Sequence, residues 1–451
     1  MGRLIMKEMK EIKKYDVVII GAATSGVYFA RKMAKRGFSV KVIEKLSAEK
    51  TGTKYDIFHV TRTDINTFDI PAVREGDPEW AFEFTDNHFS SPSNKYSIPT
   101  VAETVGLHMQ PYTALMARRA VEAGAEIEYC ASFREFVFSD GVISGVRYDS
   151  ENGPAEIGAK VVVDCSGPCA VGRRALPNGY GVERFALTDE DMFYVVLRYV
   201  RFPEAQINTF WLHAKSWYAP FSMNPTDKII GTGSTGSIER AEKEARRLDE
   251  TTLPEGGEVL RTEKGITPYR RPPYSLVADN FIVSGDAACL TKPDCGEGVT
   301  SSMVMMDIAA EVLAEALGNG DTSKEALWKI NTEYNKKQGA DFCLVRALLT
   351  KVVNAVKDEE IEYCFESNIL NSKFLNGDKL TPADIVNAVK EVAKGVSKKN
   401  ISAATIGAAL KGAALGAELR EHYMLFPQSP AKFDSWCRRS DKLWKKVGKV
   451  K

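Results

Sequence analysis

The pattern of apolar and polar residues near the start of the chain predicts a strand, a helix and a second strand. Residues 16–20 form a nearly continuous apolar run, as expected of a parallel strand that is buried on both faces. In the next segment, apolar residues recur at helical spacing and would share one face: Val27, Ala30, Met33 and Ala34. Residues 39–43 form a second apolar run. The pattern therefore predicts a βαβ unit over residues 15–45.

Glycines and one acidic residue stand where such a unit would bind a dinucleotide. Gly21 ends the first strand and would permit a tight turn, and Gly26 would let the helix pack closely on that strand. The helix N-terminus would receive a pyrophosphate, and Glu44 would accept hydrogen bonds from a ribose. The middle glycine of the usual G-x-G-x-x-G pattern is replaced by Ala23. The alternative is an ordinary βαβ unit. The other residues predicted to contact the cofactor here are Thr24, Ser25 and Lys45.

The pattern changes further along the chain. A helix is predicted at 112–124, and strands are predicted at 126–130, 133–138, 142–148 and 159–164. From about residue 178 to 265, aromatic and polar residues alternate in MFYVVLRYVRF, INTFWLHAK, SWYAPFSM and DKIIGTGSTG, which predicts an antiparallel sheet. Residues 324–451 are predicted to be mainly helical, with interruptions at 397–400 and 427–430.

Two further glycine turns follow predicted buried strands. The run at 160–164 leads into D-C-S-G at 164–167, and the run at 281–284 leads into G-D-A-A and then P-x-x-G-x-G at 293–298. Asp286 would accept hydrogen bonds from a ribityl chain, and the helix after it would direct its positive end at a flavin ring. The alternative is a glycine-rich turn with a solvent-facing Asp. Together the three turns predict FAD as the cofactor, with further contacts from Gly167, Pro293, Gly296, Gly298 and Val299.

Composition excludes several classes of protein. The 60 basic and 60 acidic residues cancel, which removes the electrostatic footprint of a nucleic-acid binder. The eight cysteines form no C-x-x-C pair and are interpreted as reduced thiols, and no metal site is predicted. No apolar run reaches the length of a membrane span, and residues 1–14 are expected to be a loose leader. We therefore expect a cytoplasmic protein, with a peripheral membrane contact through the basic tail KLWKKVGKVK as the alternative.

With these three motifs, the chain resembles the FAD-binding fold of para-hydroxybenzoate hydroxylase and its relatives. Within that superfamily it most resembles the geranylgeranyl reductases, flavoenzymes that saturate prenyl double bonds. The family-like stretches are TPYRRPPY at 267–274, the GDAA loop, and two stretches of the tail at 327–340 and 423–439. The resemblance covers nearly the whole chain. It implies an α/β fold with a Rossmann-like FAD-binding domain, an antiparallel β substrate domain and a helical C-terminal region.

The expected domains are not continuous in sequence. The FAD-binding domain is expected from residues 14–75, 101–177 and 265–320. The substrate domain is expected from residues 76–100 and 178–264, and the helical region from 321–451.

Three departures from the family lie at the following positions. Reductases of this family usually carry a Cys-Gly pair after the first βαβ unit, but the segment GTKYDIFHVTRTD at 52–64 has no cysteine, and Asp56 falls near its place. The substrate-wall motif Y-x-W-x-F-P is replaced by SWYAPF at 216–221. Leu115 stands where relatives often place an arginine that contacts FAD.

Candidate catalytic residues are taken from the predicted flavin loop and from the altered wall motif. Cys295 could donate a proton, and we expect it, rather than Asp56, to serve in place of the missing thiol. Asp294, Glu297 and Tyr218 are the other candidate proton donors. For each candidate the alternative is a structural or solvated side chain. Predicted substrate contacts are Trp217, Tyr218, Phe221 and His59, for which a role in the core is the alternative.

These expectations combine into an FAD-dependent oxidoreductase that reduces carbon–carbon double bonds of an apolar, isoprenoid-type substrate. Hydride would come from N5 of reduced flavin, and an external donor would supply the electrons: a ferredoxin, a deazaflavin or NAD(P)H. The alternatives are an aromatic hydroxylase or a halogenase on the same fold, and a flavin electron-transfer protein without small-molecule chemistry.

Overall fold

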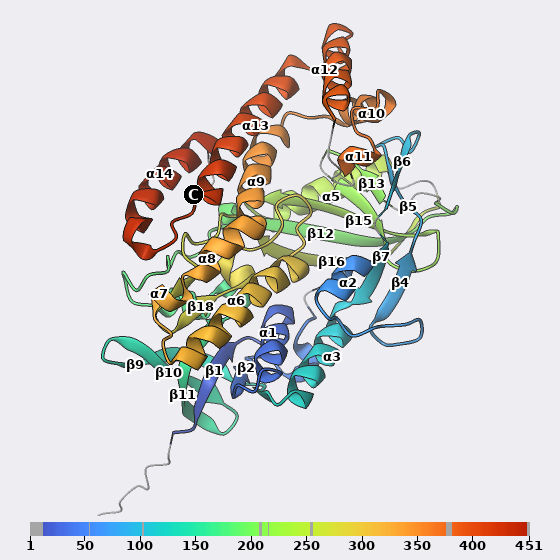
Figure 1. The fold of residues 1–451 in the computed structure, drawn as a ribbon. Coiled ribbons are helices and arrows are strands. Elements are labelled where there is room, and N and C mark those ends of the chain that lie inside the picture. Colours follow the sequence, from blue (N-terminus) through green and yellow to red (C-terminus); the bar gives the residue numbers. More distant parts are fainter. Residues whose placement is uncertain are drawn as a thin grey trace, which may run out of the picture.

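Three sheets form the frame of the protein in its computed structural model (Figure 1). The structure describes residues 12–53, 55–101, 103–206, 210–214, 216–252, 256–375 and 381–448. Part of the expected leader (1–11), part of the basic tail (449–451) and part of the predicted strand INTFWLHAK (207–209 and 215) lie outside the described residues.

The first sheet has eight strands within the described residues, in the order β17-β18-β11-β1-β2-β8, with β10 and β9 added beside β11. Its central strands are parallel: β1 (Lys14–Ile20), β2 (Val40–Ile43), β8 (Glu126–Glu128), β11 (Gly153–Asp164) and β18 (Phe281–Val283). The strands β17 (Val277–Ala278), β10 (Val142–Ser150) and β9 (Ser132–Ser139) pair antiparallel. Val17, Val18 and Ile19 are fully buried, which confirms the prediction of a strand covered on both faces.

Helices follow the parallel strands in the order that the βαβ pattern predicts. The helix α1 (Thr24–Ala34) connects β1 to β2 and contacts both α3 (Met109–Glu122) and α6 (Val299–Asn319). Valine, tyrosine, phenylalanine and methionine side chains of α1 are fully buried in the same core as the sheet: Val27, Tyr28, Phe29 and Met33. Gly285, in the turn that leads to α6, lies beside the first turn of α1, where a Cβ atom on Gly285 would be 3.4 Å from that of Ser25.

The second sheet has seven strands within the described residues, in the order β16-β12-β15-β14-β13-β5-β6. Its members are β5 (Asn87–Ser90), β6 (Ser97–Thr100), β12 (Met192–Arg201), β13 (Phe210–Leu212), β14 (Ser216–Pro220), β15 (Asp227–Thr235) and β16 (Glu258–Pro268). All pairs are antiparallel except β13 with β5. The helix α5 (Ile238–Thr252), which the sequence pattern did not predict, packs Ala241 and Ala245 against Val196 of this sheet.

A third sheet of three antiparallel strands joins the other two. It consists of β3 (Ile57–Thr61), β7 (Thr104–His108) and β4 (Trp80–Phe84), and the short helix α2 (Arg62–Thr67) follows β3. Ile57, Ala81 and Phe82 pack against Tyr199 and Ile229 of the seven-stranded sheet. Because β7 runs directly into α3, this sheet is joined to the core of the eight-stranded sheet on one side and packs against the seven-stranded sheet on the other.

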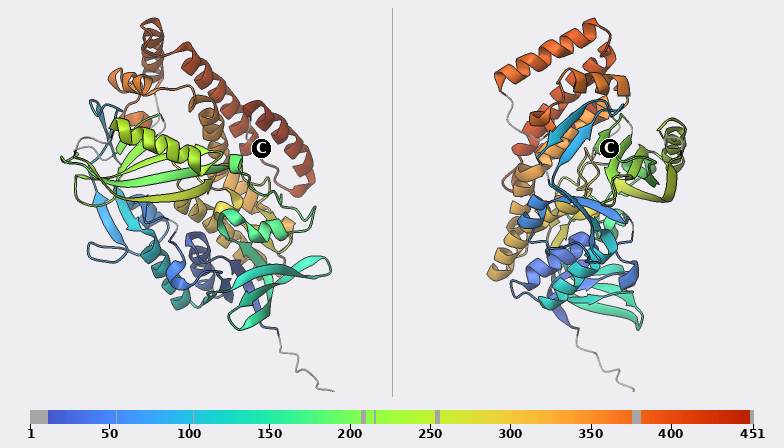
Figure 2. Two further views of the ribbon diagram at one scale, coloured as in Figure 1. Left: turned by 180° about the vertical axis from the view of Figure 1, so that it is seen from behind. Right: turned by 90° about the vertical axis from the view of Figure 1, so that its right-hand side faces the viewer.

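The end of the chain is helical, as predicted. The helices are α7 (Lys324–Leu327), α8 (Lys329–Tyr334), α9 (Ala340–Val352), α10 (Asp358–Glu366), α11 (Ser372–Leu375), α12 (Pro382–Ser397), α13 (Ala403–Met424) and α14 (Phe433–Val447), and a single π turn at Asn335–Gly339 joins α8 to α9. Helix α13 packs along α9, and α12 lies at the end of the molecule that is farthest from β9 and β10 (Figures 1 and 2). The α/β fold class expected from the sequence is therefore confirmed.

Candidate functional site

Four turns meet at one edge of the eight-stranded sheet. Ile20 pairs with both Ile43 and Asp164, and Asp164 pairs with Val283, so the carboxyl ends of four parallel strands lie level. In open sheets of this kind, ligands bind at the carboxyl ends of the strands. The three glycine turns and Glu44, which are far apart in sequence, are therefore adjacent in space.

The first turn is built so closely that only glycine fits at two positions. Gly21 has a φ of +106°, and a Cβ atom there would lie 2.4 Å from the carbonyl oxygen of Cys165. A Cβ atom at Gly26 would lie 1.9 Å from the carbonyl oxygen of Gly21. Helix α1 begins at Thr24 without a side-chain cap, and Ala23 beside it is exposed. This uncapped N-terminus, with its free backbone N–H groups, suits a pyrophosphate.

Glu44 is oriented by the backbone rather than by a charged partner. Its side chain accepts hydrogen bonds from Ala22 N at 2.8 Å and from Leu46 N at 2.9 Å. A carboxylate offers about four acceptor positions, so about two remain for ribose hydroxyls. The adjacent Lys45 is exposed. The arrangement fits the role predicted for Glu44.

The third turn places Asp286 beside the start of α6. Asp286 is half-buried and accepts a hydrogen bond from Thr291 Oγ1 at 3.2 Å. Its turn packs against the turn of Gly167, which has a φ of +70°. Pro293 is buried, Gly296 has a φ of +74°, and α6 begins after Gly298 without a side-chain cap.

These turns fit FAD in shape and donor chemistry. Two glycine positions leave no room for a Cβ atom, two helices begin without side-chain caps, and two carboxylates face the strand ends. The ribose, pyrophosphate and ribityl groups of FAD require these three kinds of partner. When bound, FAD supplies two-electron redox chemistry.

A cavity of about 400 Å³ lies between the three-stranded sheet and the seven-stranded sheet. Its wall combines apolar side chains with a charged cluster: Asp56, Ile57, Ala81, His108, Tyr199, Phe221, Ser222, Leu260 and Arg261. Tyr55, which precedes Asp56, packs its ring against Gly265 of β16, and burial followed by the nearby charge of Asp286 raises the pKa of its phenol. Thr267, at the end of β16, also lies 3.0 Å from Thr291. Two segments that line the cavity, at Asp56 and along β16, therefore also reach the loop of Asp286.

The charged cluster in the cavity centres on Asp56. His108 Nδ1 lies 2.7 Å from Asp56 Oδ1, and Arg261 forms an ion pair with Asp56 Oδ2. The hydrogen bond with His108, followed by that with Arg261, keeps the pKa of Asp56 below its usual range. Asp56 N donates to Glu263, which also accepts from the hydroxyl of Tyr199 at 3.0 Å. Sequence analysis did not predict this cluster, although it placed Asp56 near the position of the missing cysteine.

The structure brings three of the four predicted catalytic residues into one loop. Asp294 and Cys295 are exposed there, although burial of the sulfur atom, with a contribution from Asp294, raises the pKa of the Cys295 thiol to about 12. Glu297 accepts from Thr300 N at 2.7 Å and forms an ion pair with Lys292 at 2.9 Å. Tyr218 lies apart from this loop, in a buried cluster with Val200, Phe202 and Ile230.

The predicted substrate contacts lie in different surroundings. Phe221 lines the cavity. Trp217 covers Gly231, where a Cβ atom would lie 2.2 Å from the indole ring. His59 Nε2 lies 3.0 Å from the carbonyl oxygen of Pro220, and burial lowers the pKa of this imidazole. Tyr218 is on the opposite face of the sheet from the cavity, since it packs with Ile230 whereas Tyr199 packs with Ile229.

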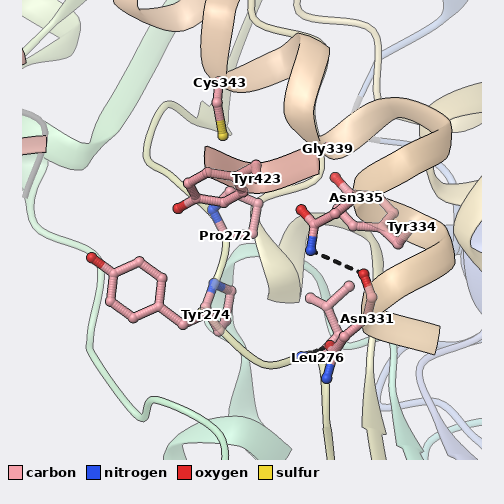
Figure 3. A pocket seen from close by; sticks show the side chains of 10 residues that line it. Pro272, Tyr274, Leu276, Asn331, Tyr334, Asn335, Gly339, Cys343 and Tyr423 are labelled. Atoms are coloured by element: carbon pink, nitrogen blue, oxygen red, sulfur yellow. Dashed lines mark hydrogen bonds between the residues drawn. The ribbon is translucent and has the colours of Figure 1, made fainter. Parts of the chain in front are cut away.

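A second void is too small to be a substrate site. It has a volume of about 10 Å³ and lies where residues 272–276 meet α8, α9 and α13, with Tyr274, Asn331, Cys343 and Tyr423 on its wall (Figure 3). A volume of this size holds about one water molecule. The larger cavity is therefore the candidate for substrate.

Features of membrane-spanning proteins and of metalloproteins are absent from the described residues. Within these ranges, no helix is both long and apolar enough to cross a membrane. The same part of the chain contains no group of three or more His, Cys, Asp or Glu side chains arranged to hold a metal ion.

Comparison with known proteins gives matches over most of the chain. A family model described as "FAD binding domain" matches residues 14–333. The digeranylgeranylglycerophospholipid reductase of Sulfolobus acidocaldarius is 24% identical over 462 aligned positions, covering 96% of this chain and 98% of the relative. Digeranylgeranylglycerophospholipid reductase 2 of Methanopyrus kandleri is 26% identical, covering 86% of this chain and 96% of the relative.

Two solved structures show a similar fold. One is a geranylgeranyl bacteriochlorophyll reductase-like protein from Thermoplasma acidophilum, with a TM-score of 0.70, 18% identity, and coverage of 86% of this chain and 97% of that chain. The other is a flavin-dependent brominase, with a TM-score of 0.65, 18% identity, and coverage of 85% of this chain and 100% of that chain. At this identity, the two structures indicate a shared fold.

Proposed function

The chain belongs to the FAD binding domain family, and we propose that it reduces carbon–carbon double bonds of an apolar, isoprenoid-type lipid. The family match confirms FAD as the cofactor and an oxidoreductase as the class of enzyme. The relatives also confirm the resemblance to the geranylgeranyl reductases.

The observation that carries the proposal is the cavity beside the FAD turns. Apolar side chains form much of its wall, which suits a hydrocarbon chain: Ile57, Ala81, Phe221 and Leu260. Its charged residues gather at one place, around Asp56. Two relatives are named as reductases of a lipid with geranylgeranyl chains, which supports an alkene as the reacting group.

We assign the chain's residues to three tasks in this reaction. Glu44 would hold the ribose, the N-terminus of α1 the pyrophosphate, and Asp286 the ribityl chain. Phe221 would form part of the wall of the substrate cavity. Trp217 and His59, which do not line the cavity, would support this wall. The wall would hold the alkene in place and exclude water from it. The division into an FAD-binding domain (14–75, 101–177 and 265–320), a substrate domain (76–100 and 178–264) and a helical region (321–451) is part of the same proposal.

The electrons would come from a separate donor. The described residues contain a single βαβ turn of the dinucleotide-binding kind, at Gly21, which we assign to FAD. A ferredoxin, a deazaflavin or transiently bound NAD(P)H would then reduce the cofactor.

A lipid substrate also suggests a lipid surface, and we propose that α12 contacts it. The apolar residues of α12 are exposed rather than packed: Ile385 by 52%, Val386 by 50%, Val389 by 63% and Val396 by 38%. The helix packs through a different side, where a Cβ atom on Gly395 would lie 2.6 Å from Tyr363. Exposed lysines border this side: Lys390 lies beside it on the helix, and Lys399 follows the end of the helix. Apolar residues flanked by lysines suit an anionic bilayer.

Anaerobic turnover tests the proposed reaction. The holoenzyme, reduced with dithionite, would be incubated with an unsaturated archaeal-type phospholipid in detergent, and the products analysed by mass spectrometry. We expect the lipid to gain two hydrogen atoms for each double bond reduced. If fully reduced enzyme binds the lipid and leaves its mass unchanged, the proposal is wrong. Substrate-stimulated oxygen uptake would instead identify a monooxygenase.

A further inference from the structure

We propose that His108, oriented by Asp56, donates the proton to the substrate carbon during alkene reduction. The inference rests on the proposed function and adds a catalytic group to which the sequence analysis assigned no role. It also replaces our expectation that Cys295, rather than the Asp56 loop, takes the place of the missing thiol.

Both side chains lie on the wall of the 400 Å³ cavity and are partly exposed, His108 by 35% and Asp56 by 26%. The 2.7 Å hydrogen bond from His108 Nδ1 to Asp56 Oδ1 places a proton on Nδ1. Nε2 is then the ring atom that can release a proton and regain it.

The backbone holds the pair rigidly. His108 pairs with Ile57 across β7 and β3, so the residue that follows Asp56 lies directly opposite the histidine. The main-chain N–H of Met109 donates to the carbonyl oxygen of Asp56 at 2.6 Å, and the N–H of His108 donates to that of Glu79 at 2.8 Å. A proton donor on two paired strands keeps its position while a long, flexible substrate moves in the cavity.

Charges around the pair keep Asp56 ionised. Arg261 forms an ion pair with the second oxygen of Asp56, and with His108 it keeps the pKa of that carboxyl low. Asp56 therefore remains a carboxylate and accepts the hydrogen bond that orients the ring of His108. The other charged or titratable groups around this part of the cavity are Glu79, Arg118, Tyr199 and Glu263.

The step balances in atoms and electrons. The π bond of the alkene breaks and two C–H bonds form. Reduced FAD would supply one hydride, which is a proton with two electrons, and the second hydrogen arrives as a proton when the Nε2–H bond of His108 breaks. The imidazole is left neutral, and it regains a proton from water at the cavity mouth before the next turnover.

The other candidate donors are less suited to this step. The thiol of Cys295 has a pKa of about 12, far above neutral pH, so it releases a proton poorly. Glu297 is held by Thr300 and Lys292. Tyr218 is buried on the opposite face of the sheet.

Three variants of the holoenzyme test the inference in the anaerobic lipid assay. We expect His108→Gln to retain FAD and a similar KM but to lower kcat by about 100-fold or more. Asp56→Asn should lower kcat and move the alkaline limb of its pH profile to lower pH, because the imidazolium loses its counter-charge. The control is His88→Gln. The Nε2 atom of His88 lies 2.9 Å from Oδ1 of Asp86, and neither residue lines the cavity. This variant should behave as wild type.

The outcomes separate the two levels of the proposal. If wild type and His108→Gln turn over equally and share a pH profile, His108 is structural and the inference is wrong, while the proposed function stands. If the reduced wild type binds the lipid without reducing it, the proposed function fails and the inference with it. If His108→Gln loses FAD, the pH profile of Asp56→Asn decides the question, and an unshifted limb overturns the inference.

Discussion

Gly26 allows α1 to approach β1 closely enough to form the first cofactor turn. A Cβ atom at this position would lie 1.9 Å from the carbonyl oxygen of Gly21, a distance that backbone atoms do not tolerate. We therefore expect Gly26→Ala to displace the N-terminus of α1, weaken FAD binding and lower the melting temperature. Flavin fluorescence titration of the apoprotein and thermal unfolding measure the two effects.

Gly318 provides the matched control for this substitution. It lies near the end of α6, and a Cβ atom added to it would have no neighbouring atom within 4 Å, so the methyl group of Gly318→Ala meets open space. Alanine is favoured over glycine in a helix by about 0.5–1 kcal/mol, so this variant should be as stable as wild type or slightly more so. Equal FAD affinity in the Gly26 and Gly318 variants would contradict our account of the turn.

The two carboxylates of the FAD site should differ in their importance. Asp286 is assigned to the middle of the cofactor, whereas Glu44 is assigned to a ribose nearer its end. Loss of a hydrogen bond to a charged group costs about 1.5–3 kcal/mol, which is roughly one to two powers of ten in affinity. We expect Asp286→Ala to weaken FAD binding more than Glu44→Ala in titrations of the apoprotein. Equal losses, or the reverse order, would refute the assignment.

The residues that sequence analysis identified lie within short motifs. Gly21, Glu44 and Asp286 each follow a predicted strand, and the structure places all three at the carboxyl ends of neighbouring strands. The cluster of Asp56, His108 and Arg261 could not be predicted in this way, because its members come from three distant segments. Their proximity depends on the pairing of β7 with β3 and on the contact of this sheet with the seven-stranded sheet, neither of which leaves a local pattern.

At the scale of elements, His422 links α13 to α14. Its ring stacks on Trp436 with centroids 4.6 Å apart, and its Nε2 lies 2.8 Å from Ser440 Oγ. Burial lowers the pKa of His422 from 6.5 to about 4. Between these two pH values the unfolded chain binds a proton that the folded chain does not. The free energy of unfolding should therefore fall as pH decreases from 6.5 to 4.

Substitution of His422 should remove this part of the pH dependence. We expect the free energy of unfolding of His422→Gln, measured with denaturant, to fall less than that of wild type between pH 6.5 and 4. Contributions from all other groups are common to both proteins and cancel in the difference. Parallel curves for wild type and variant would show that His422 does not destabilise the fold in acid.

Helices and strands could be predicted from the sequence where the spacing of apolar residues along one segment was enough to identify them. The βαβ unit and the C-terminal helices follow from apolar periodicity over many consecutive residues. Helix α5 was missed because it lies between aromatic strands and buries mainly small residues, such as Ala241 and Ala245, within a highly charged segment. The parallel pairing of β13 with β5 joins residues about 120 positions apart, and such a pairing has no local signature.

At the scale of the whole molecule, the exposed side of α12 predicts binding to anionic vesicles. The double variant Ile385→Glu and Val389→Glu should weaken sedimentation with such vesicles by about tenfold or more, because two apolar contacts are lost and negative charge is added. Val121→Glu is the control, since Val121 is 52% exposed on α3, a different part of the molecule. Equal vesicle binding by wild type and the double variant would show that α12 does not contact lipid.

The fold and the cofactor could be predicted from the sequence more completely than the residues that contact the substrate. The α/β fold, the FAD cofactor and the oxidoreductase class are confirmed. The identity of the residues that meet the substrate stays a prediction. Cofactor turns obey a fixed backbone geometry, whereas the cavity wall is assembled from loops and strand ends of two sheets that lie far apart in sequence.

The distance in sequence between the cofactor turns also determines when the protein can acquire its flavin. The hydroxyl of Ser25, in the first turn, lies 3.5 Å from that of Ser284, although 259 positions separate the two residues. A ribosome therefore releases the first βαβ unit long before it synthesises the turn that faces it. Early parts of a chain fold as they emerge, but here an early part has only half of a binding surface. Flavin must then load late in translation or afterwards, and a truncated nascent chain that ends before β18 should emerge colourless.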